Sequence, residues 1–282
     1  MAEKKIIIQS DEEKERIVMA LRPIDDILFE VLISDPGVCQ EFLQAVMENP
    51  RLRIKEDTLE AQKSIRNLAR RSVRLDAYVE GNGGTTFTIE IQRADKENHV
   101  KRVRFIASAA TVHDSNPGED FEDVRNVCVI YVSEFDVFRK HRMIYHIHSV
   151  IGETGDRIED GLEEIFIDTE NTDHGKIGRL IKHFKETMVQ DPEFPELSRR
   201  MMEIKNSPEE VRKMCKSVQE YAEKYAEEYA EKKVKKHEKK QSREFARRLI
   251  QKGGMNDSEI ASLSGLSVKE VEKLREKELS AV

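Results

Sequence analysis

Two stretches of alternating hydrophobicity in the first third of the chain predict a β-hairpin that carries acidic residues. Residues 73–79 and 85–92 each alternate with period two, and the glycine-rich segment 82–84 separates them. Centring the strand pairing on this turn places Asp76 directly opposite Glu90, with Cβ atoms about 5 Å apart. We therefore predict two carboxylates side by side on one face of the hairpin.

The chemistry of this carboxylate pair depends on what lies between the two groups. Like charges directly opposed on a sheet repel each other, so a bound divalent cation would explain the arrangement. Oxygen ligands suit Mg²⁺ or Mn²⁺, and such an ion lowers the pKa of a bound water and neutralises charge on a phosphate. Gln92 shares the face of Glu90, where its amide would orient the attacking water, whereas Ile89 and Ile91 point into the core. The ordinary alternative is a solvent-exposed face on which two acids meet by chance.

Composition and charge limit the classes of protein to which the chain can belong. Its 282 residues suffice for one core domain and an appendage, and the net charge of −7 means that any surface for nucleic acid must be local. The three cysteines are far apart, which favours reduced thiols. The longest apolar run, residues 127–132, is much shorter than the ~20 residues of a membrane span. We expect a cytoplasmic protein with no membrane segment, no signal peptide and, lacking Gly-x-x-x-x-Gly-Lys, no nucleotide cofactor.

Apolar spacing elsewhere predicts helices at the front of the chain and an α/β region in the middle. Residues 11–47 carry two helical stripes, and residues 97–113 return to helical spacing. Residues 127–132 form a continuous, β-branched-rich run, which is typical of a strand buried on both faces. Two weaker strands are expected at residues 143–150 and 163–167.

The last third of the chain is expected to be helical. A long helix begins at Pro208 and ends at Gly253-Gly254. Two short helices, 257–263 and 268–277, would form a small helix-turn-helix, with Asp257 capping the first. We therefore expect a core domain, a long charged helix and a helix-turn-helix-like tail, at residues 1–206, 207–252 and 253–282.

Two features of the long helix indicate what it contacts. Tyr221, Tyr225 and Tyr229 recur every four residues and form a stripe. It suits packing against the protein's own body or against a second copy in a homodimer, with stacking on nucleic-acid bases as the alternative. Residues 232–248 hold nine Lys or Arg residues and two Glu. This basic run suits contacts with DNA phosphates, although a solvated helix face has the same composition.

The hairpin resembles the core motif of the PD-(D/E)XK nuclease superfamily. Residues 73–79 and 87–93 carry the resemblance. Within the superfamily they resemble most specifically the putative-transposase branch, the recombination-promoting nuclease (Rpn) family. That branch has Gln where most relatives have Lys, and in this chain Gln92 occupies that position. Leu75 stands where the superfamily name has Pro.

The resemblance implies both a fold and a set of site residues. The fold is α/β, a restriction-endonuclease-like core with a mixed sheet flanked by helices, followed by a long helix and a small helical tail. Asp76 and Glu90 would be metal ligands, the Ile91 carbonyl a candidate third, and Gln92 would take the place of the catalytic lysine. Asp26 matches an Asp-x-x-Phe pattern on the first family helix and would support the site, although an acid at a helix start has an ordinary explanation. The basic residues of the helix after Gln92 would hold the DNA backbone unless they form only a solvated face: Lys101, Arg102 and Arg104.

These observations together predict a Mg²⁺-dependent or Mn²⁺-dependent DNA endonuclease that serves recombination or element mobility. The rival hypothesis is a DNA-binding or scaffold protein that keeps the nuclease fold without cleaving. It stays open because Gln92 cannot supply the positive charge of a lysine.

Overall fold

Two compact units make up the chain, residues 1–218 and 219–282. The structure is a computed structural model that describes residues 10–65, 72–95, 98–171 and 175–279. Among these residues, no helix has both the length and the apolar character needed to cross a membrane.

A mixed six-stranded sheet forms the centre of the first unit, in the order β1-β4-β5-β6-β8-β7. The neighbours β5, β6 and β8 are parallel, while the pairs β1–β4, β4–β5 and β7–β8 are antiparallel. The strands expected after residue 126 are confirmed, whereas β1 was not predicted. The strands are β1 (Ile54–Ala61), β4 (Ala77–Gly81), β5 (Thr86–Gln92), β6 (Val127–Ser133), β7 (Ile144–Ile147) and β8 (Leu162–Asp168), with β2 (Ser64–Ile65) and β3 (Val73–Arg74) in a separate two-stranded sheet.

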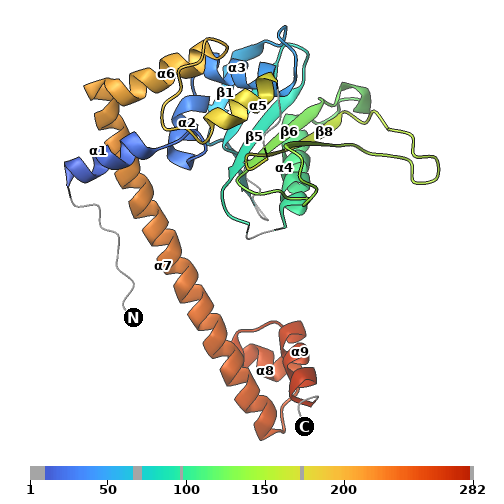
Figure 1. The fold of residues 1–282 in the computed structure, drawn as a ribbon. Coiled ribbons are helices and arrows are strands. Elements are labelled where there is room, and N and C mark those ends of the chain that lie inside the picture. The colour runs from blue at the N-terminus through green and yellow to red at the C-terminus, as the bar shows by residue number, and fades with distance from the viewer. Residues whose placement is uncertain (1–9, 66–71, 96–97, 172–174, 280–282) are drawn as a thin grey trace. The chain divides into compact units, whose positions relative to one another are not determined.

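Helices cover both faces of the large sheet, which confirms the predicted α/β class (Figure 1). One face packs against α1, α2, α3, α5, α6 and the start of α7, in a core that contains Ile89, Ile91 and Ile130. The other face packs against α4, in a second core around Tyr131 and Phe166. These helices are α1 (Asp11–Ala20), α2 (Asp26–Ile33), α3 (Pro36–Val46), α4 (His99–Asp114), α5 (Lys176–His183), α6 (Pro195–Asn206) and α7 (Pro208–Lys252).

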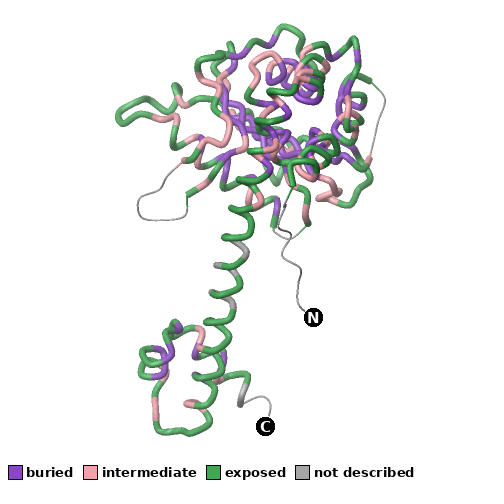
Figure 2. The backbone as a smooth tube through the Cα atoms, turned by 90° about the vertical axis from the view of Figure 1, so that its left-hand side faces the viewer, coloured by how far each residue is buried: buried purple, intermediate pink, exposed green. Residues whose placement is uncertain are grey.

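Burial follows this layered arrangement. All seven residues of β6 are buried, as expected for a strand covered on both faces. In Figure 2 the purple, buried residues gather inside the first unit, while the middle of α7 is green along most of its described length.

Side-chain hydrogen bonds cap the first turns of α3 and α4. The Asp35 carboxylate accepts hydrogen bonds from the backbone N–H groups of Gly37 and Val38 at the start of α3. The Asn98 side chain accepts a hydrogen bond from the N–H of Lys101, at 3.1 Å, and so caps α4. Such caps satisfy N–H groups that have no partner within the helix.

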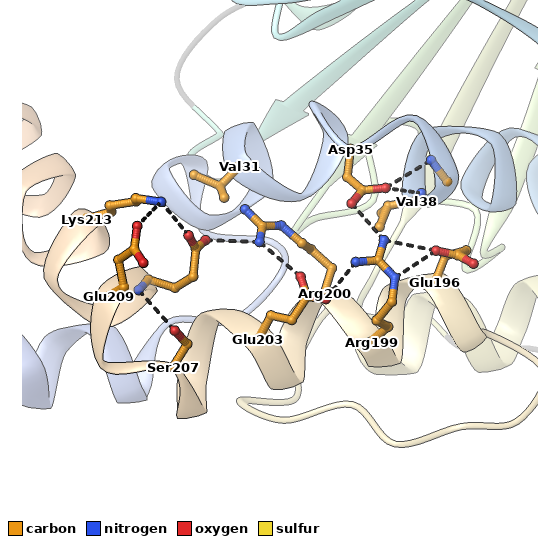
Figure 3. A network of polar contacts seen from close by, with 12 residues as sticks. Val31, Asp35, Val38, Glu196, Arg199, Arg200, Glu203, Ser207, Glu209 and Lys213 are labelled. Carbon is orange, nitrogen blue, oxygen red and sulfur yellow. Dashed lines mark hydrogen bonds and ion pairs between the residues drawn. The ribbon is translucent and has the colours of Figure 1, made fainter.

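A network of ion pairs joins α6 to the start of α3 (Figure 3). Arg199 lies 2.8 Å from Asp35, the residue that caps α3. It also pairs with Glu196 and Glu203 of its own helix, each at 2.9 Å. Arg200 extends the network to Glu203 at 3.2 Å. Because Arg199 pairs with Asp35 as well as with residues of its own helix, the network joins α6 to α3.

The second unit is a small three-helix arrangement around the end of α7. It also contains α8 (Asp257–Ser264) and α9 (Val268–Leu279). The expected cap at Asp257 is wrong, because the Asn256 side chain accepts the N–H of Glu259 while the Glu259 carboxylate accepts the N–H of Asn256. Gly265 follows α8 with φ +69°, a conformation that favours glycine. The buried core consists of Ala246, Ile260, Ala261, Leu266, Val271 and Leu274.

Candidate active site

The register of the β4–β5 hairpin is the one predicted from the sequence. Ala77 pairs with Ile89 and Tyr78 with Thr88, so the same register extends to Asp76 and Glu90. The single strand expected at residues 73–79 is nevertheless wrong. Between β3 and β4 the chain passes from the small two-stranded sheet into the large sheet. There the N–H of Leu75 donates to the Lys63 carbonyl, and the Asp76 carbonyl accepts the N–H of Gln62. Asp76 therefore sits immediately before β4, at a break in the strand.

Asp76 and Glu90 are locked together across this break. The Asp76 Oδ2 atom accepts the N–H of Ile91 at 2.8 Å, and the Glu90 Oε1 atom accepts the N–H of Asp76 at 3.2 Å. Glu90 has no exposed surface, and Asp76 is half-buried. The pair therefore lies in the interior beside α4 and does not form the solvent-exposed face of the alternative interpretation.

Burial and mutual repulsion perturb both carboxyl groups. Burial raises the pKa of Glu90 to about 8, with a further increase from the charge of Asp76, while Arg102 opposes the shift. Burial also raises the pKa of Asp76 to about 6; the N–H of Ile91 opposes this, and the charge of Asp26 adds to it. Even with Arg102 beside Glu90, the two groups thus resist holding two negative charges at neutral pH.

Arg102 reaches into the site from α4. Its guanidinium lies 3.2 Å from Glu90 Oε2 and donates a hydrogen bond of 3.1 Å to Gln92 Oε1. The Gln92 amide nitrogen donates to the Ala94 carbonyl at 3.1 Å, so both ends of this amide are held. Lys101 and Arg104, in contrast, are exposed on α4. The structure therefore separates the three basic residues of this helix, and only Arg102 contacts the carboxylate pair.

The Ile91 carbonyl points toward the same break. In an extended strand the N–H and C=O of one residue point to the same edge, and the N–H of Ile91 is bonded to Asp76. The carbonyl oxygens of the neighbouring residues point the other way, because Gln92 accepts a hydrogen bond from Glu134 after β6. The backbone oxygen of Ile91 thus lies on the edge of β5 that carries Asp76.

These oxygens suit a hard divalent cation. Two carboxylates and one carbonyl leave room in the coordination shell for waters and a phosphate oxygen, which is the usual arrangement around Mg²⁺. Among the described residues no cluster of three or more His, Cys, Asp or Glu side chains could hold a metal ion. The oxygen donors at this site are those of Asp76, Glu90 and the Ile91 backbone, a set that would fit Mg²⁺ or Mn²⁺ better than zinc.

Asp26 lies at the start of α2, close enough for its charge to raise the pKa of Asp76, and its side chain is exposed.

The preceding residue, Asp25, is buried and joins this helix start to the sheet. Its carboxylate lies 2.7 Å from Arg93 and 3.2 Å from Arg22. Both arginines also pair with Glu134, at 2.8 Å and 3.1 Å, which closes a ring of four charges. This ring fixes α2 against the ends of β5 and β6.

Sequence reasoning missed several residues of this region. Gln62 holds the Asp76 backbone, and its side-chain amide is 3.4 Å from Asp76 Oδ1; its own φ of +55° is unusual for a residue other than glycine. His99 is buried and links Tyr131 to Asp95, with contacts of 2.7 and 3.0 Å. No periodicity or motif marks Gln62, whereas His99 stands in the first turn of the predicted helix and could have been noted there.

Comparison with known proteins identifies the family of this chain. The family model described as PD-(D/E)XK nuclease family transposase matches residues 23–250. The chain belongs to this family. Its mixed sheet flanked by helices is the restriction-endonuclease-like fold expected of a PD-(D/E)XK nuclease family transposase. No curated protein and no solved structure gave a significant match. Family membership supports a nuclease-associated or transposase-associated role for the protein.

Proposed function

We propose that this protein is a DNA endonuclease that depends on Mg²⁺ or Mn²⁺ and acts in recombination or transposition, as in the Rpn branch of the family. The observation that carries the proposal is the pair formed by the half-buried Asp76 and the buried Glu90, each of which accepts a hydrogen bond from the other's strand at the break between β3 and β4. Such a pair lowers the stability of the fold, because two neighbouring acids away from solvent repel each other. A purely structural role therefore does not explain it. A cation held by both carboxylates and the Ile91 carbonyl accounts for their placement.

The residues around the pair have distinct roles in this proposal. When bound, the cation would lower the pKa of a bound water and neutralise charge on the phosphate. Gln92 orients the attacking water, because its amide is fixed at both ends by Arg102 and the Ala94 carbonyl. Arg102 supplies, from α4, the positive charge that Gln92 lacks relative to a lysine. Asp26 supports the site at its exposed side, through its charge.

DNA is the proposed substrate, held by exposed basic residues next to the site. Lys101 and Arg104 lie on the exposed surface of α4, where they are accessible to phosphates. The basic run at residues 232–248 is a second proposed contact; within it, Lys239 already pairs with Glu270 of α9 at 2.8 Å. The thiols of Cys39, Cys128 and Cys215 are free, which supports the proposed cytoplasmic location.

Nicking of a supercoiled plasmid tests the proposal. We expect the wild-type protein to convert supercoiled DNA to open circles with Mg²⁺ or Mn²⁺, and EDTA to abolish the reaction. Salt-dependent DNA binding without nicking under any of these conditions would reject the endonuclease and favour a DNA-binding or scaffold protein that retains the fold.

We also propose that α7 mediates a homodimer. Tyr221 and Tyr225 are 40% and 61% exposed, and their rings stack with centroids 6.4 Å apart; the third member of the stripe, Tyr229, lies outside the described side chains. Replacing Tyr221 and Tyr225 with alanine is expected to weaken the dimer at least about tenfold, because aromatic side chains dominate interface energies. Sedimentation equilibrium of the full chain measures this, with Phe121→Ala as the control because Phe121 is 96% exposed in the first unit. A wild-type protein that is monomeric at all concentrations would contradict the proposal.

A further inference from the structure

Four consecutive basic residues, 139–142, form a loop at the end of the sheet where β5 finishes with Gln92. The loop joins β6 to β7. Because β5 and β6 are parallel, Gln92 and Ser133 end their strands side by side, and the N–H of Glu134 donates to the Gln92 carbonyl at 3.2 Å. The loop leads into β7 at Ile144, which pairs with Ile167 near the carboxyl end of β8. Both ends of the loop therefore lie at this end of the sheet.

The loop is anchored on the face of the sheet that carries the carboxylate pair. Phe138 packs against Tyr145 and Phe166, with ring centroids 4.9 and 5.0 Å apart. Phe166 belongs to the core beneath α4, and Glu90 points to this face because its neighbours Ile89 and Ile91 point to the other. The basic loop and Glu90 therefore lie toward the same end of the sheet and on the same face.

Asp136 holds the loop in one conformation. Its carboxylate accepts hydrogen bonds from the N–H groups of Phe138, Arg139 and His141, and from the Tyr145 hydroxyl. Arg139 and His141 have φ angles of +56° and +55°. This left-handed conformation is unfavourable for residues other than glycine, and such strain concentrates at functional sites. The bonds to Asp136 offset the strain and fix where the basic side chains emerge.

The positive charges of the loop face solvent. Arg139, Lys140, His141 and Arg142 are all exposed. Arg139 lies 3.9 Å from Asp95, which follows β5 near the site. Within the part of the chain that the structure describes, the side chains of Lys140 and Arg142 have no ion pair. In a protein of net charge −7, this exposed group of three permanent cations, at the same end of the sheet as the carboxylate pair, is a local excess of positive charge.

From these observations we propose that loop 139–142 binds the phosphate backbone of duplex DNA next to the cleaved bond. This inference rests on the proposed endonuclease function and adds to it a surface that positions the substrate. Contacts of this kind are independent of base sequence and sensitive to salt, and a preformed loop binds with little loss of conformational entropy.

Fluorescence anisotropy with a labelled 20-base-pair duplex tests the proposal, using the full-length protein in EDTA so that the DNA stays intact. Substituting both Lys140→Gln and Arg142→Gln is expected to weaken binding by about threefold to tenfold near 0.15 M salt. It should also make the slope of log K against log salt less negative by about 1 to 2, about one for each lost phosphate contact. The matched control is Arg51→Gln with Arg157→Gln, two exposed arginines at the opposite end of the strands. The control should bind within about twofold of wild type, because distant charges are screened at this salt concentration.

The outcomes separate this loop from the endonuclease proposal. Equal affinity and equal salt slope for the loop variant and the control would reject the loop, while metal-dependent nicking by wild type would leave the endonuclease proposal standing. A similar loss in both variants would also reject the loop, because it would indicate an effect of net charge alone. Tighter binding to an RNA duplex of the same sequence would reject the assignment to DNA. No duplex binding by the wild-type protein in EDTA would reject the loop, whereas the endonuclease proposal stands or falls on nicking with Mg²⁺ or Mn²⁺.

Discussion

Replacing Glu90 with glutamine is expected to weaken Mn²⁺ binding by at least about 100-fold. The substitution keeps the volume of the side chain and one acceptor oxygen for the N–H of Asp76, but it removes a ligand charge. Loss of a residue that merely supports a metal ligand costs 10-fold to 100-fold in affinity, so loss of a ligand should cost at least as much. Isothermal titration calorimetry of the full-length protein measures the change.

The matched control for this substitution is Glu164→Gln. Glu164 is a buried glutamate of β8, its pKa is also raised by burial, and it lies outside the carboxylate pair. Its substitution should leave Mn²⁺ affinity within about twofold of wild type, since long-range effects of removing one charge are small. Equal Mn²⁺ affinity for Glu90→Gln and wild type would show that Glu90 is not a ligand.

The same Glu90→Gln variant should change how stability depends on pH in the metal-free protein. The pKa of Glu90 is raised from 4.5 to about 8 in the folded state, so the folded protein binds more protons than the unfolded chain between these values. Stability should therefore fall as pH rises from about 5 to 8, by about 1 kcal/mol for each pH unit. Urea denaturation in EDTA should show this slope in wild type and a flatter profile in the variant. Parallel profiles would contradict the electrostatic account of the site.

Replacing Lys205 with methionine is expected to lower the free energy of unfolding by about 3 kcal/mol. Lys205 of α6 is buried, and its ammonium group donates hydrogen bonds to the carbonyls of Val18, Met19 and Leu21 at the end of α1. Burial lowers the pKa of Lys205 to about 8, so the charged form still predominates at pH 7. Methionine fills the space but leaves these carbonyls without their donor, in a place with little access to water.

Urea denaturation followed by circular dichroism measures the loss, with Lys182→Met as the control. Lys182 is an exposed lysine of α5, where the same substitution should change stability by no more than about 0.5 kcal/mol. A loss for Lys205→Met as small as that of the control would mean that the three hydrogen bonds do not contribute to the attachment of α1.

The part of the site that could be predicted is the part that depends on local periodicity. Alternating residues and a glycine-rich turn determine the register of the hairpin, and the register brings Asp76 and Glu90 together. The interruption of the strand was missed because it depends on pairing with Gln62 and Lys63, which precede the hairpin and carry no distinguishing pattern. Burial of Glu90 was missed for a related reason, because the side of the hairpin that α4 covers is a property of the tertiary structure.

The basic residues illustrate the same limit from another side. A run of charges on a helix predicts a positive surface but does not say which member faces inward. Arg102 faces Glu90 and Gln92 because Val103 and Ile106 of the same helix pack against the sheet. The conformation of loop 139–142 was equally hidden, since it depends on Asp136 and Tyr145 meeting across the connection between two strands.

The central claim is that Asp76 and Glu90 form the catalytic centre of a metal-dependent endonuclease. The most direct test compares plasmid nicking in Mg²⁺ and Mn²⁺ by wild type, Asp76→Ala, Glu90→Ala and the buried-acid control Glu164→Gln, all purified identically. We predict that both alanine variants lose at least about 10³-fold in rate, since removing a group that stabilises charge in the transition state has effects of this size. The control should retain wild-type activity. Nicking that survives both alanine substitutions at the wild-type rate would contradict the claim.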